Sequence, residues 1–383
     1  MSELSTKDLH VLSHNYYNVP GIKAVDKNGN THTYTNLNRE VLGVESNGIY
    51  TPPAGTAYET VAINVQDTTG YFDLTTWDGL GRLAASGYAP YMLEVGGIIN
   101  GTYTRTDGTV YDYPWIIVDF QDVELENGTV RKNVPILQAQ YTGHESVVFD
   151  AAETTVATET TAQDGYYYVG RSSSTYTLLS LNTGDTIPYS EYATAVYKTP
   201  WNTNGYVQFG ENCWARSNLR QYLNSSGTGW WIAQHSCDVA PSASQTGFVT
   251  YMPSDMLSVV KSIKKTTTRA NYMGGTIDIT YDKFWIASHS EMNITGSYVA
   301  DDSEAWEYYK QILESDTPVA SGTYGALSHY SCANTLSQQT YWSRSVSKVT
   351  AYEFIIGASG STGSAGTAYT GYAVLPCCAL TGA

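Results

Sequence analysis

Apolar residues in this sequence come in short runs, and segments rich in glycine, threonine and asparagine separate one run from the next. Short runs leave room only for short strands and a few short helices, joined by long loops. Hydrophobic residues make up 42% of the 383 residues, enough to bury a substantial core, while charged residues reach only 15%. The pattern predicts an α+β fold arranged as one large domain or as two to three smaller ones.

Helical spacing of apolar residues marks a small number of segments. The first begins near Asp73 and carries Leu74, Trp77 and Leu80 on one face, with Gly87 as a stop signal. The remaining helices are expected at 212–224, 254–263 and 303–313. Asn212 and Ser254 are candidate N-caps for the second and third of these helices. The positive charges of Lys264 and Lys265 would interact favourably with the negative, C-terminal end of the helix dipole.

Strands are expected on both sides of the tight-turn sequence Glu126-Asn127-Gly128. The flanking runs, 113–120 and 134–141, predict a β-hairpin. Residues 151–165 are polar and rich in threonine and alanine, which predicts an exposed loop. Everything after Thr340 is expected to be strand or glycine-rich loop.

The composition of the first 69 residues differs from that of the rest. Tyr58, Val61, Ile63 and Val65 largely alternate after a Pro/Gly turn, which predicts strand, turn and strand in a small β module. We therefore expect domains at 1–69 and 70–383, with an insertion in the second near 151–200.

Charge and hydropathy exclude several classes of partner. The net charge is −16, and no cluster of Lys and Arg is present, which argues against nucleic acid. No apolar stretch approaches the roughly 18 residues of a membrane span, so no membrane insertion is expected. The start, MSELSTKDLH, lacks the basic and apolar regions of a signal peptide, so synthesis in a cytoplasm without export by the ordinary signal route is expected.

A search for enzyme chemistry finds no convincing constellation. The sequence has no GxSxG elbow, no HExxH motif, no P-loop and no GxGxxG opening a helix. Ser288, His289 and Glu291 are the most site-like group, but neighbours on a strand point to opposite faces, which favours a structural hydrogen-bonding role. No enzyme activity and no cofactor are predicted.

The five cysteines are too few and too scattered for a disulfide framework. Buried thiols are the expected state, and Cys377 and Cys378 are interpreted as packing residues of a terminal strand. The spacing of cysteines and histidines suggests no zinc site, and no oxygen-ligand loop suggests calcium.

The run from Ala358 to Tyr372 consists of small polar residues punctuated by tyrosine. Strand-like sequences, 352–356 and 372–376, bracket it, which favours a structured surface turn and strand over a linker. Antibody paratopes have this composition, because tyrosine supplies rigid contact area while serine and glycine adapt their hydrogen bonding. An inert, solvated loop is the alternative.

Four motifs in order resemble one protein family. Residues 210–224 are similar to its N-W-x-x-S-x-x-R-x-W-L-N block, and 282–291 to D-K-x-F-L-L-S-x-x-E. Residues 341–345 resemble Y-W-L-R-S, with Ser343 in place of an aliphatic residue, and 371–380 resemble a terminal G-V-x-P-A strand. The family is C-type-lectin-like and related to formylglycine-generating enzymes, and many members are variable proteins of diversity-generating retroelements found in phages.

The resemblance implies a diversified ligand-binding region over 342–380. Adenine-targeted mutagenesis of AAY codons yields a restricted set of residues, and every residue from Ala358 to Tyr372 falls within it. Lys348 and Glu353 fall outside it and are expected to be fixed, while Trp342 and Arg344 are expected to be scaffold. The expected ligand-binding residues are Val346, Ser347, Thr350, Tyr352, Phe354, Ser359, Ser361, Ser364, Thr367, Tyr369 and Tyr372.

The N-terminal segment Asn47-Gly-Ile-Tyr-Thr-Pro-Pro-Ala-Gly55 resembles N-G-T-Y-T-P-P-x-G units of phage structural proteins. Together the resemblances imply a phage receptor-binding protein, located on the virion as a tail fibre or other exposed structure. Its partners would be a bacterial surface protein or glycan and other virion proteins, and its assembly a homotrimer by analogy with phage fibres.

Two alternatives to a receptor-binding protein remain open. One is a structural fibre or decoration protein without a specific receptor. The other is an oxidase of the formylglycine-generating type, whose copper chemistry needs a spaced cysteine pair where this sequence has only the adjacent Cys377 and Cys378.

Overall fold

The computed structural model describes residues 73–151, 213–232, 240–241, 245–269, 277–296, 303–346 and 352–382. For a further set of strands, between residues 22 and 63 and between 159 and 197, it describes the backbone alone. Helices and many antiparallel sheets occur together, which confirms the predicted α+β class.

The N-terminal strands form one five-stranded sheet in the order β2-β1-β5-β4-β3. The pairing of β4 with β5 confirms the predicted strand, turn and strand. Their bounds are β1 (Ile22–Val25), β2 (Thr31–Tyr34), β3 (Val44–Ser46), β4 (Ile49–Thr51) and β5 (Val61–Ile63).

The strands between 159 and 197 form two small sheets, β12-β15 and β14-β13-β16. Because β12 covers 159–161, the prediction that 151–165 is all loop was wrong there, and residues 152–158 and 162–165 lie outside the described part of the chain. The bounds are β12 (Glu159–Thr161), β13 (Tyr166–Ser172), β14 (Thr175–Leu179), β15 (Thr186–Pro188) and β16 (Tyr192–Tyr197).

The first five-stranded sheet of the main domain has the order β19-β26-β10-β9-β6. Strands β9 and β10 form the predicted hairpin around Asn127-Gly128, and Gly128 adopts the positive φ of 80° that the tight turn requires. The bounds are β6 (Ile98–Ile99), β9 (Trp115–Glu124), β10 (Val130–Ala139), β19 (Phe284–Ile286) and β26 (Pro376–Ala379).

The second five-stranded sheet has the order β11-β25-β22-β23-β24. It contains most of the region after Thr340, where the prediction of strand and loop is confirmed for the described residues. The bounds are β11 (Ser146–Val148), β22 (Tyr341–Val346), β23 (Tyr352–Ile356), β24 (Ser364–Thr367) and β25 (Gly371–Ala373).

Three two-stranded ribbons accompany these sheets. They are β7 (Thr102–Thr104) with β8 (Val110–Asp112), β17 (Ile263–Thr268) with β18 (Ile277–Asp282), and β20 (His329–Ser331) with β21 (Asn334–Gln339).

Helix α3 (Trp77–Ser86) confirms the first helix prediction. The Thr76 hydroxyl accepts a hydrogen bond from the Gly79 amide at the start, and Gly87 ends the helix in the left-handed conformation. The short α4 (Ala89–Met92) follows. Helix α7 (Glu307–Ile312) confirms a helix within 303–313, although it is shorter than expected.

The predictions for the two middle helices were partly wrong. The segment 212–224 divides into a 3₁₀ turn, η2 (Trp214–Arg216), and α5 (Asn218–Leu223), whose start is capped by Ser217; Asn212 lies outside the described residues. Helix α6 (Ser254–Val259) ends early, and Lys264 and Lys265 belong to β17, so they do not complement the helix dipole.

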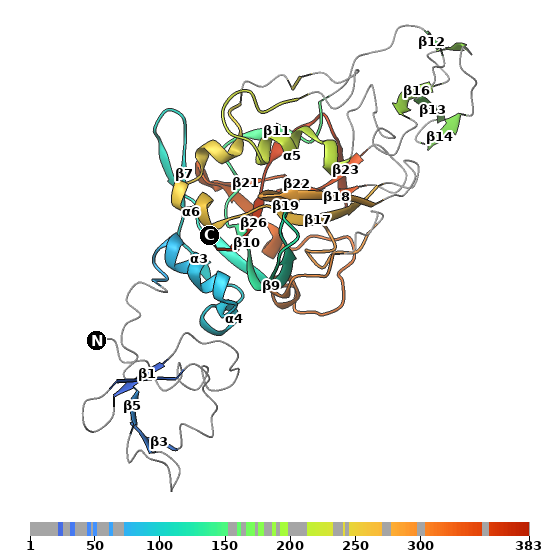
Figure 1. Ribbon diagram of the computed structural model, residues 1–383. Helices are drawn as coiled ribbons and strands as arrows, with labels where there is room; N and C mark the ends of the chain where they lie inside the picture. The colour runs from blue at the N-terminus through green and yellow to red at the C-terminus, as the bar shows by residue number, and fades with distance from the viewer. Residues whose placement is uncertain are drawn as a thin grey trace.

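The chain's last strand lies inside the first sheet, between β19 and β10. The Leu380 amide donates to the Pro135 carbonyl, and Gly382 packs against Gly81 of α3. Figure 1 accordingly shows the C-terminus beside α3. One aromatic-rich core fills the interior between these elements, with Trp115, Trp214, Trp285, Trp306 and Trp342 among its fully buried side chains. The end of the domain therefore closes onto its beginning.

A buried ion cluster lies beneath the second sheet. The Glu291 carboxylate accepts from Lys265 Nζ at 2.6 Å and pairs with Arg344 Nη2 at 3.0 Å. Arg344 also donates to the carbonyls of Ile286 and Thr266. Burial alone would raise the pKa of Glu291, but the two nearby positive charges outweigh it and hold that pKa below its usual value. Each of the two buried cations is thereby paired with the same buried carboxylate.

We expect Glu291→Gln to lower the free energy of unfolding by about 3–5 kcal/mol, because two buried cations lose their shared anion. Urea unfolding at pH 7, followed by tryptophan fluorescence, measures the change. Glu307→Gln is the control, since its pair with Lys310 is 3.9 Å long and partly exposed to solvent and should contribute about 0.5 kcal/mol or less. Equal effects of the two changes would show that the cluster does not stabilise the fold.

Candidate ligand-binding surface

Most of the predicted binding residues lie on the second sheet or in the turns that join its strands. Val346 ends β22, while Tyr352 and Phe354 belong to β23. Ser364 and Thr367 bound the edge strand β24. The remaining described candidates are in the turn before β24, at Ser359 and Ser361, and in or before β25, at Tyr369 and Tyr372.

The described candidates differ sharply in exposure. Ser359, Ser364 and Tyr369 are exposed, Tyr369 at 44%. Ser361 and Tyr372 are half-buried. Val346 and Phe354 are buried, at 1% and 7%, so they can support the surface but offer a ligand almost no area. Ser347 and Thr350 lie outside the described residues, and only the backbone of Tyr352 and Thr367 is described.

Trp342 supports this surface from below. Its indole nitrogen donates to the Val147 carbonyl of β11 at 2.7 Å, and its ring meets the Tyr372 ring edge-on at 4.8 Å. The Tyr372 ring also lies against Gly366 of β24, where an added Cβ would come within 2.7 Å of it. Trp342 and Gly366 therefore fix the orientation of Tyr372. Trp342 and Arg344 are both buried, as the scaffold interpretation expects.

The turn before β24 is ordered by hydrogen bonds to a neighbouring segment. The Gly357 amide donates to the Ser361 carbonyl, and the Tyr324 amide donates to the Gly360 carbonyl. The Thr362 hydroxyl accepts from the Gly322 amide at 3.1 Å. These contacts confirm that the serine- and glycine-rich run after Ala358 is a structured surface turn and strand.

Glu353 is the most unusual ionisable group of this region. Its side chain is fully buried on β23, and neither carboxyl oxygen has a hydrogen-bond partner among the described residues. Burial raises the pKa of Glu353 well above its usual value, and the charge of Arg344 offsets this only in part. The neutral, protonated form of Glu353 is therefore favoured more strongly than that of an exposed carboxyl group. The sequence marked it as a fixed position but gave no sign of its burial.

The Ser288, His289 and Glu291 group has the structural role that the sequence favoured. These residues form a turn after β19, so the strand assumed for them was wrong. The Ser288 hydroxyl accepts from the Glu291 amide at 3.1 Å, and Glu291 Oε2 accepts from the Ser288 amide at 2.9 Å. Burial lowers the pKa of His289 to about 3, which keeps its ring neutral, and the ring packs against Phe354 at 5.0 Å.

Cys377 and Cys378 are fully buried free thiols on β26, which confirms their packing role. Within the described ranges, no group of three or more His, Cys, Asp or Glu side chains could hold a metal ion. None of the described helices has both the length and the apolar character needed to cross a membrane.

A second buried network involves the residues of the tryptophan-containing motif. Asp282 accepts from Trp214 Nε1 at 2.9 Å, from Arg220 Nε at 2.6 Å and from the Thr280 hydroxyl at 2.7 Å. Asn224 donates to the Phe284 carbonyl at 2.8 Å and so joins α5 to β19. Residues of separate sequence motifs thus meet in the interior beside the second sheet.

Comparison with known protein families gives one match. A profile described as a domain of unknown function, DUF6273, matches residues 184–382, just over half of the chain. The chain belongs to this family. No curated protein and no solved structure gives a significant match. The DUF6273 segment includes both buried networks and the whole candidate surface, whereas β9 and β10, which pair beside β26, precede it.

We expect Glu353→Gln to stabilise the protein at neutral pH but not in acid. The unfolded chain releases the Glu353 proton near pH 4.5, while the raised pKa makes the folded protein retain it to higher pH. The contribution of Glu353 to the free energy of unfolding is therefore intact below pH 4.5 and is lost as the pH rises. The advantage of the variant should grow by roughly 1.4 kcal/mol per pH unit above that point, until the folded carboxyl ionises. Urea unfolding between pH 4 and 8 measures it, and a constant difference would contradict the prediction.

We expect Gly360→Ala to destabilise the turn, because Gly360 has φ of 82° and its Cβ would lie 1.9 Å from the Tyr324 carbonyl oxygen. The loss should be about 1–3 kcal/mol in the free energy of unfolding. Gly371→Ala is the matched control, since its Cβ would meet only Ser146 at an ordinary 3.8 Å. A smaller loss for Gly360→Ala than for Gly371→Ala would refute the importance of this close approach.

Proposed function

We propose that this protein is a non-enzymatic receptor-binding protein of a bacteriophage, with a C-type-lectin-like domain that presents the second sheet to a host-cell ligand. The observation that carries the proposal is the contrast within one sheet. Exposed serine, glycine and tyrosine residues on β24 and its turns lie beside a rigid interior of buried ion pairs and tryptophan. Binding proteins need this combination of adaptable surface and preorganised support.

The family resemblance supports the lectin-like part of the proposal through the positions of its motifs. Trp214, Arg220 and Asp282 belong to two different motifs and bond to one another. Glu291, from the same motif as Asp282, pairs with Arg344 of a third motif. Residues that resemble a family's motifs at three separate places therefore act as one scaffold, which is what a shared fold would require.

On this proposal the protein is part of a tail fibre or another exposed structure of the virion, and it assembles as a homotrimer. Residues 1–69 would attach it to other virion proteins, and the domain over 70–383 would bind a bacterial surface protein or glycan. A purely structural fibre or decoration protein is the competing function, and it differs in having no specific receptor.

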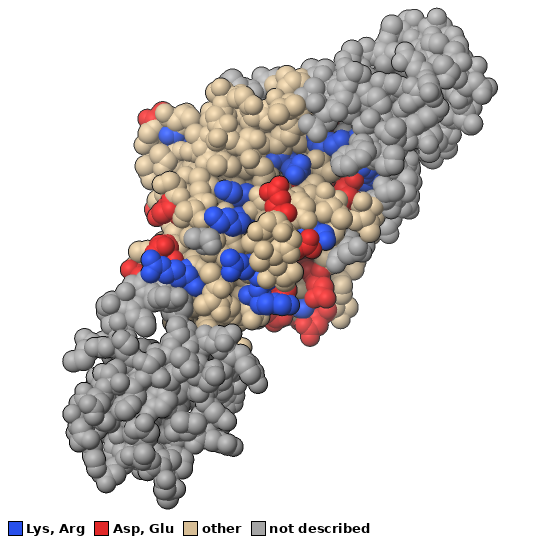
Figure 2. All heavy atoms as spheres, in the orientation of Figure 1, with Lys and Arg blue, Asp and Glu red and all other residues tan. Residues whose placement is uncertain are grey.

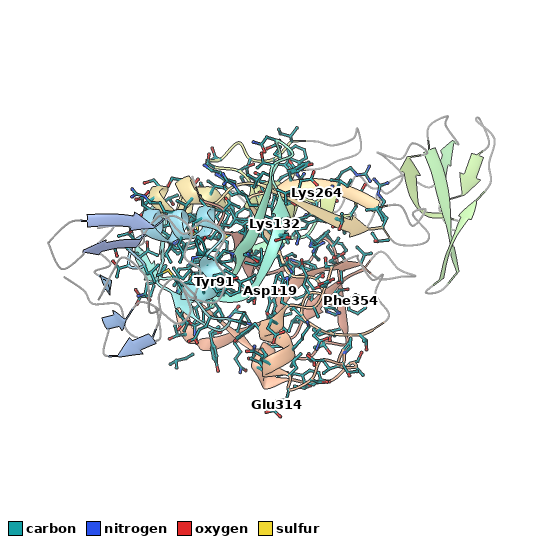
Figure 3. All side chains as sticks on the ribbon, turned by 60° about the horizontal axis from the view of Figure 1, so that its bottom comes forward. Tyr91, Asp119, Lys132, Lys264, Glu314 and Phe354 are labelled. Carbon is teal, nitrogen blue, oxygen red and sulfur yellow. The ribbon has the colours of Figure 1, made fainter. Side chains whose placement is uncertain are left out.

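We expect the full-length protein to bind intact cells of some gut Firmicutes strains, and Tyr369→Ala to weaken that binding about tenfold or more, because Tyr369 is an exposed aromatic contact. Flow cytometry of labelled protein measures the change, with Tm as a check on folding. Tyr91→Ala, on α4 and away from Phe354 in Figure 3, is the matched control and should bind normally. Absence of binding to every strain would favour the structural virion role.

A further inference from the structure

We infer that the ligand of this surface is an uncharged, hydroxyl-rich polymer, that is, a neutral glycan of the bacterial surface. The inference rests on the proposed function and narrows its ligand class. It follows from the chemistry of the exposed groups on β24, β25 and their turns.

The first observation is the absence of charge. From Val346 to Ala373 the sequence has only two residues of ionisable acid or base type, Lys348 and Glu353, in a chain of net charge −16. Lys348 lies outside the described residues, and the Glu353 side chain is fully buried, so it presents no charge at the described surface. Figure 2 shows Lys, Arg, Asp and Glu side chains interspersed over much of the described face of the molecule.

An uncharged surface selects against ionic ligands. A teichoic acid or an acidic protein patch would lose hydration on contact and find no opposite charge in return. A neutral polysaccharide carries no such cost, because its hydroxyl groups can exchange water for protein donors and acceptors.

The second observation is the kind of polar group that is exposed. Ser359 and Ser364 carry hydroxyl groups, each of which can both donate and accept a hydrogen bond. Strand β24 is an edge strand that pairs only with β23 among the described strands, so backbone N–H and C=O groups on its outer side can serve as further partners. Sugar hydroxyl groups can likewise both donate and accept hydrogen bonds, so they can pair with the donors and with the acceptors of this surface.

The third observation is the placement of the tyrosine rings. Tyr369 is exposed, and Tyr372 is half-buried and held by Trp342 and Gly366. A fixed ring costs little conformational entropy on binding and offers an apolar face to the C–H side of a sugar ring.

The test uses a strain that the full-length protein binds, and it compares the native protein with Ser364→Lys and Ser364→Asp. Ser364 is exposed at the start of β24, so both substitutions fit without burying a charge. For a neutral ligand we expect both variants to weaken binding by similar factors, and native binding to change less than about twofold between 50 and 500 mM NaCl. An anionic ligand would instead bind Ser364→Lys more tightly and Ser364→Asp more weakly, which would overturn the inference.

Treatment of the cells distinguishes glycan from protein. Periodate, which cleaves vicinal diols, should abolish binding, and protease treatment should leave it unchanged. Loss of binding after protease alone would overturn the inference while leaving the receptor-binding function intact. Failure to bind any untreated strain would remove the proposed function, and the inference with it.

Discussion

The shared pairing of Glu291 with Lys265 and Arg344 is the constraint on which the rest of the domain depends. A carboxylate this deeply buried is tolerated only with compensating charge, and the two cations come from β17 and from β22. Because Glu291 lies in the turn after β19, the cluster joins a ribbon, the first sheet and the second sheet at one point. The direction of β22 is set there, and with it the position of Trp342 beneath the candidate surface.

A second anion, Asp282, repeats this arrangement nearby. Its partners Trp214 and Arg220 belong to the η2–α5 segment, so the helix is held to β18 by bonds that leave both carboxylate oxygens occupied. The charged groups of these two networks are paired in the interior, while the edge of the second sheet carries small, uncharged side chains. The buried pairs and the exposed residues of β24 are therefore different residues, so the exposed ones can change with little effect on the buried pairs.

Local signals predicted local structure well, and long-range pairing explains the failures. Thr76, Gly87 and Asn127-Gly128 act through their own neighbours, so α3 and the β9–β10 hairpin could be predicted. Lys265 was assigned to the end of a helix because its positive charge follows the helical apolar pattern. It lies instead in β17, where its ammonium group donates a hydrogen bond to Glu291. The pair of Lys265 with Glu291 joins residues 26 positions apart in the sequence, and no local pattern predicts such a pair. The C-terminal end of α6 was predicted too late in the sequence for the same reason.

For the candidate surface, the sequence predicted a region but not which of its side chains face outward. Strand β23 is covered on both faces, since Phe354 packs on His289 while Glu353 on the other face is influenced by the charge of Arg344. The pairing of β22 with β23 also shifts register between Trp342 and Val346. Contact area is therefore concentrated on β24 and the turns around it. Within that area, Gly366 must remain small to admit the Tyr372 ring. A ligand surface diversified on this fold would vary around such fixed positions, and its shape would change less than its hydrogen-bonding pattern.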